Sequence, residues 1–158
     1  MFGLKSAATN VAVQGGVAVA QAAGTLSANV EVTLMLFQAK GVTKQIATVS
    51  KSLSGIIGRT VAEIAIVAED IIEHIEKNPK DFTVVRSFFD YNLGKAHEVI
   101  QARENLADPN EATVAALDKV IGEVKENFES FMKKCKANDI EGAAIASETL
   151  SRIIQARI

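Results

Sequence analysis

Residues 114–135, VAALDKVIGEVKENFESFMKKC, decide the fold class of this chain. Apolar residues recur through this stretch at alternating steps of three and four, at Val114, Leu117, Ile121, Val124, Phe128, Phe131 and Cys135. Such a seam places these side chains on one face of a helix, which then packs against a neighbouring helix. We therefore predict an amphipathic helix over residues 109–136, with Leu117 and Phe128 in the core.

A second apolar stripe with the same helical period lies upstream. It consists of Ile46, Val49, Leu53, Ile57, Val61, Ile64, Ala68, Ile71 and Ile75. Gly55 and Gly58 fall within this stripe, so we expect the helix to bend or split there. We expect it to stop near Lys77, because a new start signal follows.

That start signal occupies residues 78–81, Asn-Pro-Lys-Asp. Asn78 is a preferred helix cap, proline suits the first helical position, and an aspartate is favoured near the positive end of the helix dipole. A similar signal occupies residues 108–111, Asp-Pro-Asn-Glu. We therefore predict one helix over about 79–107 and the next from 109 onwards.

An Asn-Asp pair at residues 138–139 turns the chain into a last helix, whose inward residues are predicted to be Ala143, Ala146, Leu150 and Ile153. Long apolar stripes joined by short connections favour antiparallel neighbours. No segment has the pattern of a sheet. We predict an all-α fold, an antiparallel helical bundle of about four to six helices.

The N-terminal segment differs from the rest because residues 6–30 carry no charge and are rich in Ala, Val and Gly. Three structures fit this composition: a small-residue helix packed closely against others, a segment in contact with a membrane, and a hairpin turning at Gly15-Gly16. Its glutamines and glycines make it a poor spanning helix. We divide the chain into this segment, residues 1–41, for helical packing or membrane contact, and a helical bundle, residues 42–158.

Charge is distributed unevenly along the chain. Residues 1–62 carry five Lys or Arg against one acid, Glu31, whereas residues 63–158 carry the remaining twelve against eighteen acids. With a net charge of −2, this pattern does not resemble a uniformly basic nucleic-acid binder, so we expect no nucleic acid as a partner. The single cysteine excludes an internal disulfide and favours a reducing, cytoplasmic location.

The residues that could carry chemistry form no recognisable catalytic or metal-binding pattern. Asp70 and His74 stand four apart on one predicted helix face, but Ile71 stands where a carboxylate-bridged metal site needs glutamate. Cys135 lies on the apolar seam, where a buried inert thiol is expected. We therefore expect no cofactor and favour a non-catalytic protein, with a hydrolase built from scattered residues as an alternative.

Residues 86–94, RSFFDYNLG, concentrate aromatic side chains beside a glycine. In a continuous helix the core face centres on Phe89 and includes Phe82, Val85, Leu93, Ala96, Ile100 and Ala107, whereas Tyr91 lies about 160° away. The back face then consists of Val84, Ser87, Tyr91 and Gly94, and we predict that a second body approaches it closely at the glycine. This body is either the N-terminal helix of the same chain or a partner, so these four residues are our candidate interaction site.

Four basic residues, Lys40, Lys44, Lys51 and Arg59, lie in a stretch without acids between Glu31 and Glu63. An ordinary solvated face explains them. The alternative is attraction to an anionic membrane surface, worth about 1 kcal/mol per basic residue near the lipid.

The second half of the chain resembles a known bacterial family. The stretch FFDYNLGKAHEVIQARENL is similar to the aromatic-Tyr-x-Leu segment of the bromo-chloro-indolyl phosphate hydrolysis protein family, and VIGEVKENFESFMKKCKANDIEGAAIASETL resembles its closing pair of helices. The resemblance covers about residues 82–155, and Gly94 stands where that family tends to have proline. It implies a membrane-associated helical protein that accompanies toxic-anion (tellurite) resistance, and it assigns no catalytic residue to this chain.

Three functions follow as expectations. The first is a non-catalytic helical interaction protein, peripheral to the inner face of a bacterial membrane and linked to stress or toxic-anion resistance. The second is a structural subunit of a larger assembly, such as a phage or secretion particle. The third is the hydrolase. For the first two, a protein partner or self-association is expected.

Overall fold

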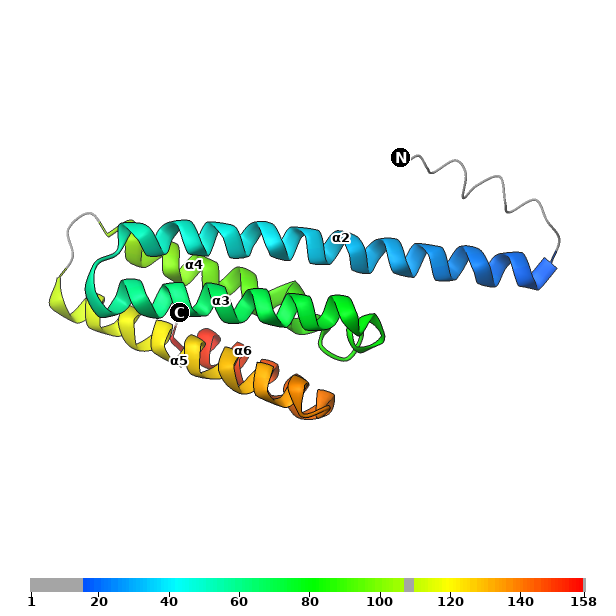
Figure 1. Ribbon diagram of the computed structural model, residues 1–158. Coiled ribbons are helices and arrows are strands. Elements are labelled where there is room, and N and C mark those ends of the chain that lie inside the picture. Colours follow the sequence, from blue (N-terminus) through cyan, green and yellow to red (C-terminus); the bar gives the residue numbers. More distant parts are fainter. Residues whose placement is uncertain (1–15, 107–109, 158) are drawn as a thin grey trace. The chain divides into compact units, whose positions relative to one another are not determined.

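The computed structural model describes residues 16–106 and 110–157, and these residues form helices and turns without a strand. The α-helices are α2 (Gly16–Ser52), α3 (Gly55–Lys77), α4 (Leu93–Glu104), α5 (Glu111–Lys136) and α6 (Ile140–Arg157), shown in Figure 1. Between α3 and α4 lie a 3-10 turn, η1 (Pro79–Asp81), and a π-helical turn, η2 (Phe88–Asn92). The all-α prediction is confirmed.

The chain divides into two compact units, Met1–Met35 and Leu36–Ile158. Of the first unit, the structure describes the part of α2 that begins at Gly16. A hairpin strand after Gly15-Gly16 is therefore wrong, because the chain is already helical from Gly16, while residues 6–15 lie outside the described part. None of the described helices has both the length and the apolar character needed to cross a membrane.

In the second unit, α5 is the central element and contacts α3, α4 and α6. The later turns of α2 lie over α3 and α4, where Lys40 bonds to Glu76 on α3 and Ser52 bonds to Glu104 on α4. The core between these helices is apolar, and its largest fully buried side chains include Ile46, Ile64, Ile71, Phe88, Phe128 and Phe131. Phe128 is in the core, as predicted.

The long apolar stripe divides between α2 and α3, as its glycines indicate. The chain turns at residues 53–54, and Gly55 has a left-handed φ of +71°, which favours glycine. A Cβ added at Gly58 would clash with the backbone carbonyl of Leu53. Gly58 is therefore required by the close return of α3 past the end of α2.

A single helix over 79–107 is wrong. After η1, the amide of Val84 bonds to the carbonyl of Asp81 and that of Val85 to Phe82, both at 3.1 Å, which are tight i→i+3 bonds. Three β-branched residues in a row, 83–85, lower helix propensity there. Asn78 also differs from its predicted role: its side chain bonds to the carbonyl of His74 at 2.9 Å and closes the end of α3.

The aromatic cluster is centred one residue earlier than predicted, at Phe88 rather than Phe89. Phe88 is buried, and its ring centroid lies 4.9 Å from that of Phe128 and 4.7 Å from that of Phe131. Phe89 is half-buried and stacks on Phe82 at 5.3 Å. The i→i+5 bond from the Leu93 amide to the Phe88 carbonyl adds a residue to this turn and shifts the helical phase.

The last two helices follow the predicted pattern with small shifts. Helix α5 begins at Glu111, and the side chain of Asn110 caps it by accepting a bond from the Thr113 amide at 2.8 Å. Leu117 is half-buried rather than in the core. In α6, Ile154 is buried and Ile153 is half-buried, so the inward position near its end was predicted one residue too early.

Candidate interaction site: a groove between α4, α5 and α6

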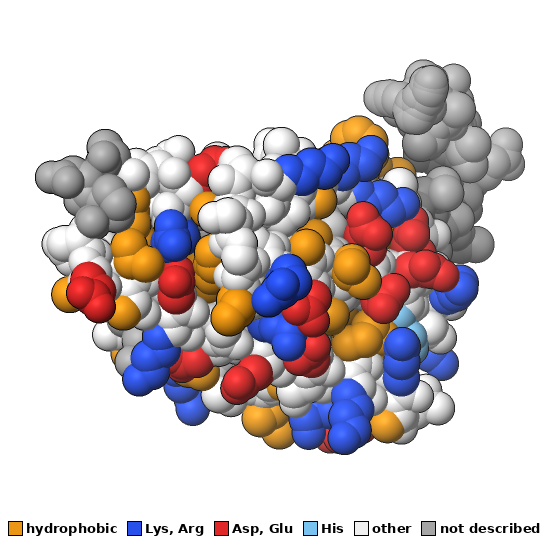
Figure 2. Space-filling view, turned by 60° about the vertical axis from the view of Figure 1, so that its left-hand side comes forward, with side chains coloured by type: hydrophobic (Ala, Val, Ile, Leu, Met, Phe, Trp, Pro, Cys, Tyr) orange, Lys and Arg blue, Asp and Glu red, His pale blue; other side chains and the backbone are white. Residues whose placement is uncertain are grey.

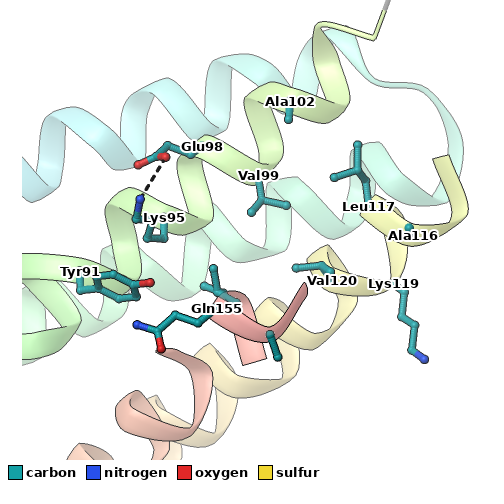
Figure 3. Close-up of a pocket in the computed structure, with 12 residues that line it drawn as sticks. Tyr91, Lys95, Glu98, Val99, Ala102, Ala116, Leu117, Lys119, Val120 and Gln155 are labelled. Atoms are coloured by element: carbon teal, nitrogen blue, oxygen red, sulfur yellow. Dashed lines mark hydrogen bonds and ion pairs between the residues drawn. The ribbon is translucent and has the colours of Figure 1, made fainter. Parts of the chain in front are cut away.

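A groove of about 790 Å³ opens between α4, the first turns of α5 and the last turns of α6 (Figure 3). Helices α5 and α6 are antiparallel neighbours joined by a short turn, and α5 has 26 residues whereas α6 has 18. The described part of α6 therefore leaves roughly the first two turns of α5 uncovered. The groove lies beside these turns of α5.

The floor of the groove is apolar. Val99, Val120 and Ile154 are buried beneath it, one from each of the three helices, and Leu117 is half-buried at its side. Exposed alanine positions, among them Ala102 and Ala116, form the walls, so the groove is not narrowed by long side chains. A surface of this kind gains free energy by taking up apolar side chains, at about 25 cal/mol per Å² buried.

The rim of the groove is polar and aromatic at one end. The ammonium of Lys95 lies 5.8 Å from the centre of the Tyr91 ring and 3.3 Å from a carboxylate oxygen of Glu98. Figure 3 shows these three side chains on the α4 side, with Gln155 on α6 and Lys119 on α5. Tyr91 thus combines a rigid apolar ring with a polar hydroxyl, the combination common in interface anchors.

A buried polar network holds the walls of the groove in register. The side-chain amide of Asn92 donates to the carbonyl of Ser147 at 2.7 Å, and the hydroxyl of Ser151 donates to the Asn92 side-chain oxygen at 2.8 Å. The hydroxyls of Ser87 and Ser147 lie 3.0 Å apart. These bonds tie η2 to α6, and Asn92 and Ser147 are fully buried.

The four residues predicted as an interaction site do not form one surface. Tyr91 lies on the groove rim, but Ser87 is bonded to α6, and Val84 lies in the turn before η2 with 44% of its surface exposed. The described part of the chain makes no close approach at Gly94, because a Cβ there would meet no described atom within 4 Å; the approach of a partner stays a prediction. The element in contact with Ser87 is α6, through Ser147.

Sequence reasoning missed most of the groove. Leu117 was placed within a core seam, and this assignment has the right helix face although Leu117 is only half-buried. No pattern in the sequence marks Gln155 or the alanines of the groove walls as binding residues. Nothing in a single sequence tells which turns of α5 lie beside the described part of α6, and that packing decides which of these residues are exposed.

The four basic residues predicted to face lipid occupy different surroundings. Lys40 forms an ion pair of 2.6 Å with Glu76 of α3, and with Lys44 it lines a hollow shared with Glu69 and Glu73. Lys51 and Arg59 are exposed on either side of the α2–α3 turn. On the face in Figure 2, basic and acidic side chains lie interspersed over the part that is coloured by type.

The structure also shows where the residues lie that could carry chemistry, namely Asp70, His74 and Cys135. No cluster of three or more His, Cys, Asp or Glu in the described ranges could hold a metal ion, and Asp70 is exposed beside a half-buried His74. Cys135 is buried and free, and burial, together with the nearby Asp81 carboxylate, raises the pKa of its thiol to about 11. A thiol with that pKa stays protonated at neutral pH and is a poor nucleophile.

Searches of protein-family models, curated proteins and solved structures found no match to this chain. The family resemblance of residues 82–155 stays a prediction.

Proposed function

We propose that the protein is a non-catalytic helical interaction protein, and that its groove between α4, α5 and α6 binds an amphipathic helix of a protein partner. The observation that carries this proposal is the apolar floor of the groove, formed by Val99, Val120 and Ile154 and bordered by a polar rim. An amphipathic helix that buries apolar residues at steps of three and four in such a groove is a recurring mode of peptide recognition.

The chemistry of the rim supports binding rather than catalysis. Its acid, Glu98, is tied to Lys95, and Lys95 also lies against the Tyr91 ring, so these groups orient one another. A general base must be free to accept a proton from a substrate within hydrogen-bond reach. In this rim the carboxylate of Glu98 is instead paired with the ammonium of Lys95. The hydrolase alternative gains nothing from the groove.

The remaining parts of the proposal rest on sequence. The single cysteine supports a cytoplasmic location, and the resemblance of residues 82–155 supports a link to bacterial stress or toxic-anion resistance. A peripheral membrane position takes second place, because Lys40 and Lys44 face acidic side chains of α3. Flotation with anionic vesicles at low and high salt tests the membrane position.

The groove is tested by selecting helical peptides against the purified full chain from a randomised amphipathic library. Ala116→Glu places a charge in the groove wall, whereas Ala115→Glu places one on the preceding residue, which is also exposed but lies outside the groove. We expect selected peptides to lose about 10-fold or more in affinity for Ala116→Glu, which is ~1.4 kcal/mol, and to bind Ala115→Glu like the parent. Equal binding to both variants, or no selected peptide, contradicts the proposal.

A further inference from the structure

The groove between α4, α5 and α6 carries hydrogen-bond donors at one end. Figure 3 shows Tyr91, Lys95 and Gln155 gathered there, and their side chains hold a phenolic O–H, an ammonium and an amide NH₂ group. The ammonium of Lys95 lies 3.3 Å from Glu98, and 39% and 63% of these two side chains are exposed. An exposed pair contributes little free energy, and an ammonium has three N–H donors, so Lys95 is able to donate to a bound molecule as well.

Helices α4 and α5 run in opposite directions along the groove. Val99 of α4 and Val120 of α5 lie together in its floor, and one turn further along α4 Arg103 pairs with Asp118 of α5 at 2.7 Å. Residue numbers therefore rise along α4 while they fall along α5. Going along the groove from Lys95, one moves away from the start of α4 and towards the start of α5.

The other end of the groove is apolar and leads towards an acid. Ala102, Ala116 and Leu117 line this end in Figure 3. Helix α5 begins at Glu111, which is exposed and lies about 7.5 Å before Ala116 along the helix axis. The surface thus has a basic residue at one end of the groove and an acidic residue just beyond the other.

A bound helix would be a dipole along this same line. The last four carbonyls of a helix are free acceptors at its negative end, and the first four amides are free donors at its positive end. With its C-terminal end at Lys95, a partner helix would offer acceptors to the donors gathered there, and its positive end would point towards Glu111. The reverse direction would bring the positive end of the helix against the ammonium of Lys95, which is unfavourable.

We infer that the partner helix lies antiparallel to α4, with its C-terminal turn at Tyr91, Lys95 and Gln155. The inference rests on the proposed function and adds the direction of the partner and its chemistry. The α4 wall from Tyr91 to Ala102 is about 16 Å long, which is three helical turns. The partner is therefore an amphipathic helix with an apolar stripe of about this length, followed in its last turn by an Asp or Glu that pairs with Lys95.

The first test fixes the direction by methyl NMR on the full chain, with a selected helical peptide that carries a nitroxide spin label at one end or the other. A label at the C-terminal end should broaden the methyl resonances of Ile154, next to Gln155, more than those of Leu117, and a label at the N-terminal end should do the reverse. The opposite pattern, or equal broadening by both labels, overturns the inference and leaves the proposed function standing. A bound peptide that broadens neither residue, or the absence of any binding peptide, overturns both.

The second test measures the pairing with Lys95. A selected peptide is made with Glu and with Gln in its last turn, and both forms are titrated against the parent, Lys95→Gln and Lys133→Gln, which removes an exposed lysine of α5 outside the groove. We expect the parent and Lys133→Gln to bind the Glu form about 3-fold more tightly, the size of a partly exposed charge pair, and Lys95→Gln to lose this preference. Binding without a preference in the parent, or a preference that survives in Lys95→Gln, overturns the inference but not the proposed function.

Discussion

Asn92 and Ser147, 55 positions apart in sequence, are joined by a hydrogen bond of 2.7 Å from the asparagine side-chain amide to the serine carbonyl. Both residues are fully buried. This bond fixes the π-helical turn against α6 and so sets the distance between two walls of the groove. A polar pair of this kind specifies one arrangement of helices that apolar contacts alone would leave free to slide.

We predict that Asn92→Leu lowers the free energy of unfolding by about 1–3 kcal/mol, although leucine has nearly the same volume. The reason is that the Ser147 carbonyl and the Ser151 hydroxyl lose their bonds to Asn92 inside the protein. Urea unfolding followed by circular dichroism measures the loss. Gln101→Leu, at an exposed position of α4, is the control and should change stability by less than about 0.5 kcal/mol. Equal effects of the two variants would mean that the network contributes nothing specific.

The second prediction compares neighbouring phenylalanines. Phe88→Ala should cost about 3–5 kcal/mol, because its ring is buried against Phe128 and Phe131. Phe89→Ala should cost clearly less, since Phe89 is half-buried. The measurement is the difference in unfolding free energy between the two variants. A larger loss of unfolding free energy for Phe89→Ala would mean that Phe89, and not Phe88, faces the core. That result would contradict the π-helical turn.

These two residues also show how far the sequence predicts the fold. The stripe in α3 and the seam in α5 have long uninterrupted periods, so the fold class and the helix faces follow from spacing. The split at Gly55 follows from the glycines and not from the spacing. Around Phe88 the helical period no longer predicts the buried face. The i→i+5 bond at this turn rotates the side chains that follow it, about the helix axis, relative to the side chains that precede it. A pattern that averages 3.6 residues per turn cannot register one added residue.

The groove lay beyond sequence reasoning for a different reason. Its floor residues are ordinary valines and isoleucines that also fit a closed core, such as Val120 and Ile154. They border a groove because the described part of α6 does not cover the first turns of α5, and the period of a single sequence does not tell how far one helix lies along another. Tyr91 was found because a large aromatic stood opposite the predicted core face, beside Ser87 and Gly94.

The third prediction concerns two glycines in helices. Gly58→Ala should destabilise the protein, because the new Cβ would clash with the backbone carbonyl of Leu53, which cannot move like a side chain. Gly122→Ala should stabilise it by about 0.5–1 kcal/mol, because no described atom lies within 4 Å of a Cβ there. Thermal unfolding of both variants checks the signs. A stabilising Gly58→Ala would contradict the close passage of α3 beside the end of α2.

The fourth prediction follows from the raised pKa of Cys135, which burial and the Asp81 carboxylate bring to about 11. The folded protein holds this proton to higher pH than the unfolded chain, whose thiol has an ordinary pKa of about 8.5. The stability contribution of the neutral thiol is therefore complete below about pH 8.5 and is lost as the pH rises towards 11.

Reaction with an aromatic disulfide reagent at pH 8 measures this property of Cys135 directly. In the native protein the thiol should react roughly 100-fold or more slowly than in the urea-unfolded chain, because it is buried and protonated. A Ser54→Cys variant in a Cys135→Ser background provides an exposed thiol as the control. Native Cys135 reacting as fast as this control would place it at the surface.

The central claim, that the groove binds a partner helix, is tested most directly by methyl NMR on the full chain during titration with a selected helical peptide. The methyl resonances of Leu117, Val120 and Ile154 should shift in a saturable manner, because these side chains line the groove. Those of Ile64 and Ile71, buried on α3, should stay unchanged. Shifts confined to residues outside the groove, or saturable binding that leaves Val120 and Ile154 unaffected, would contradict the account.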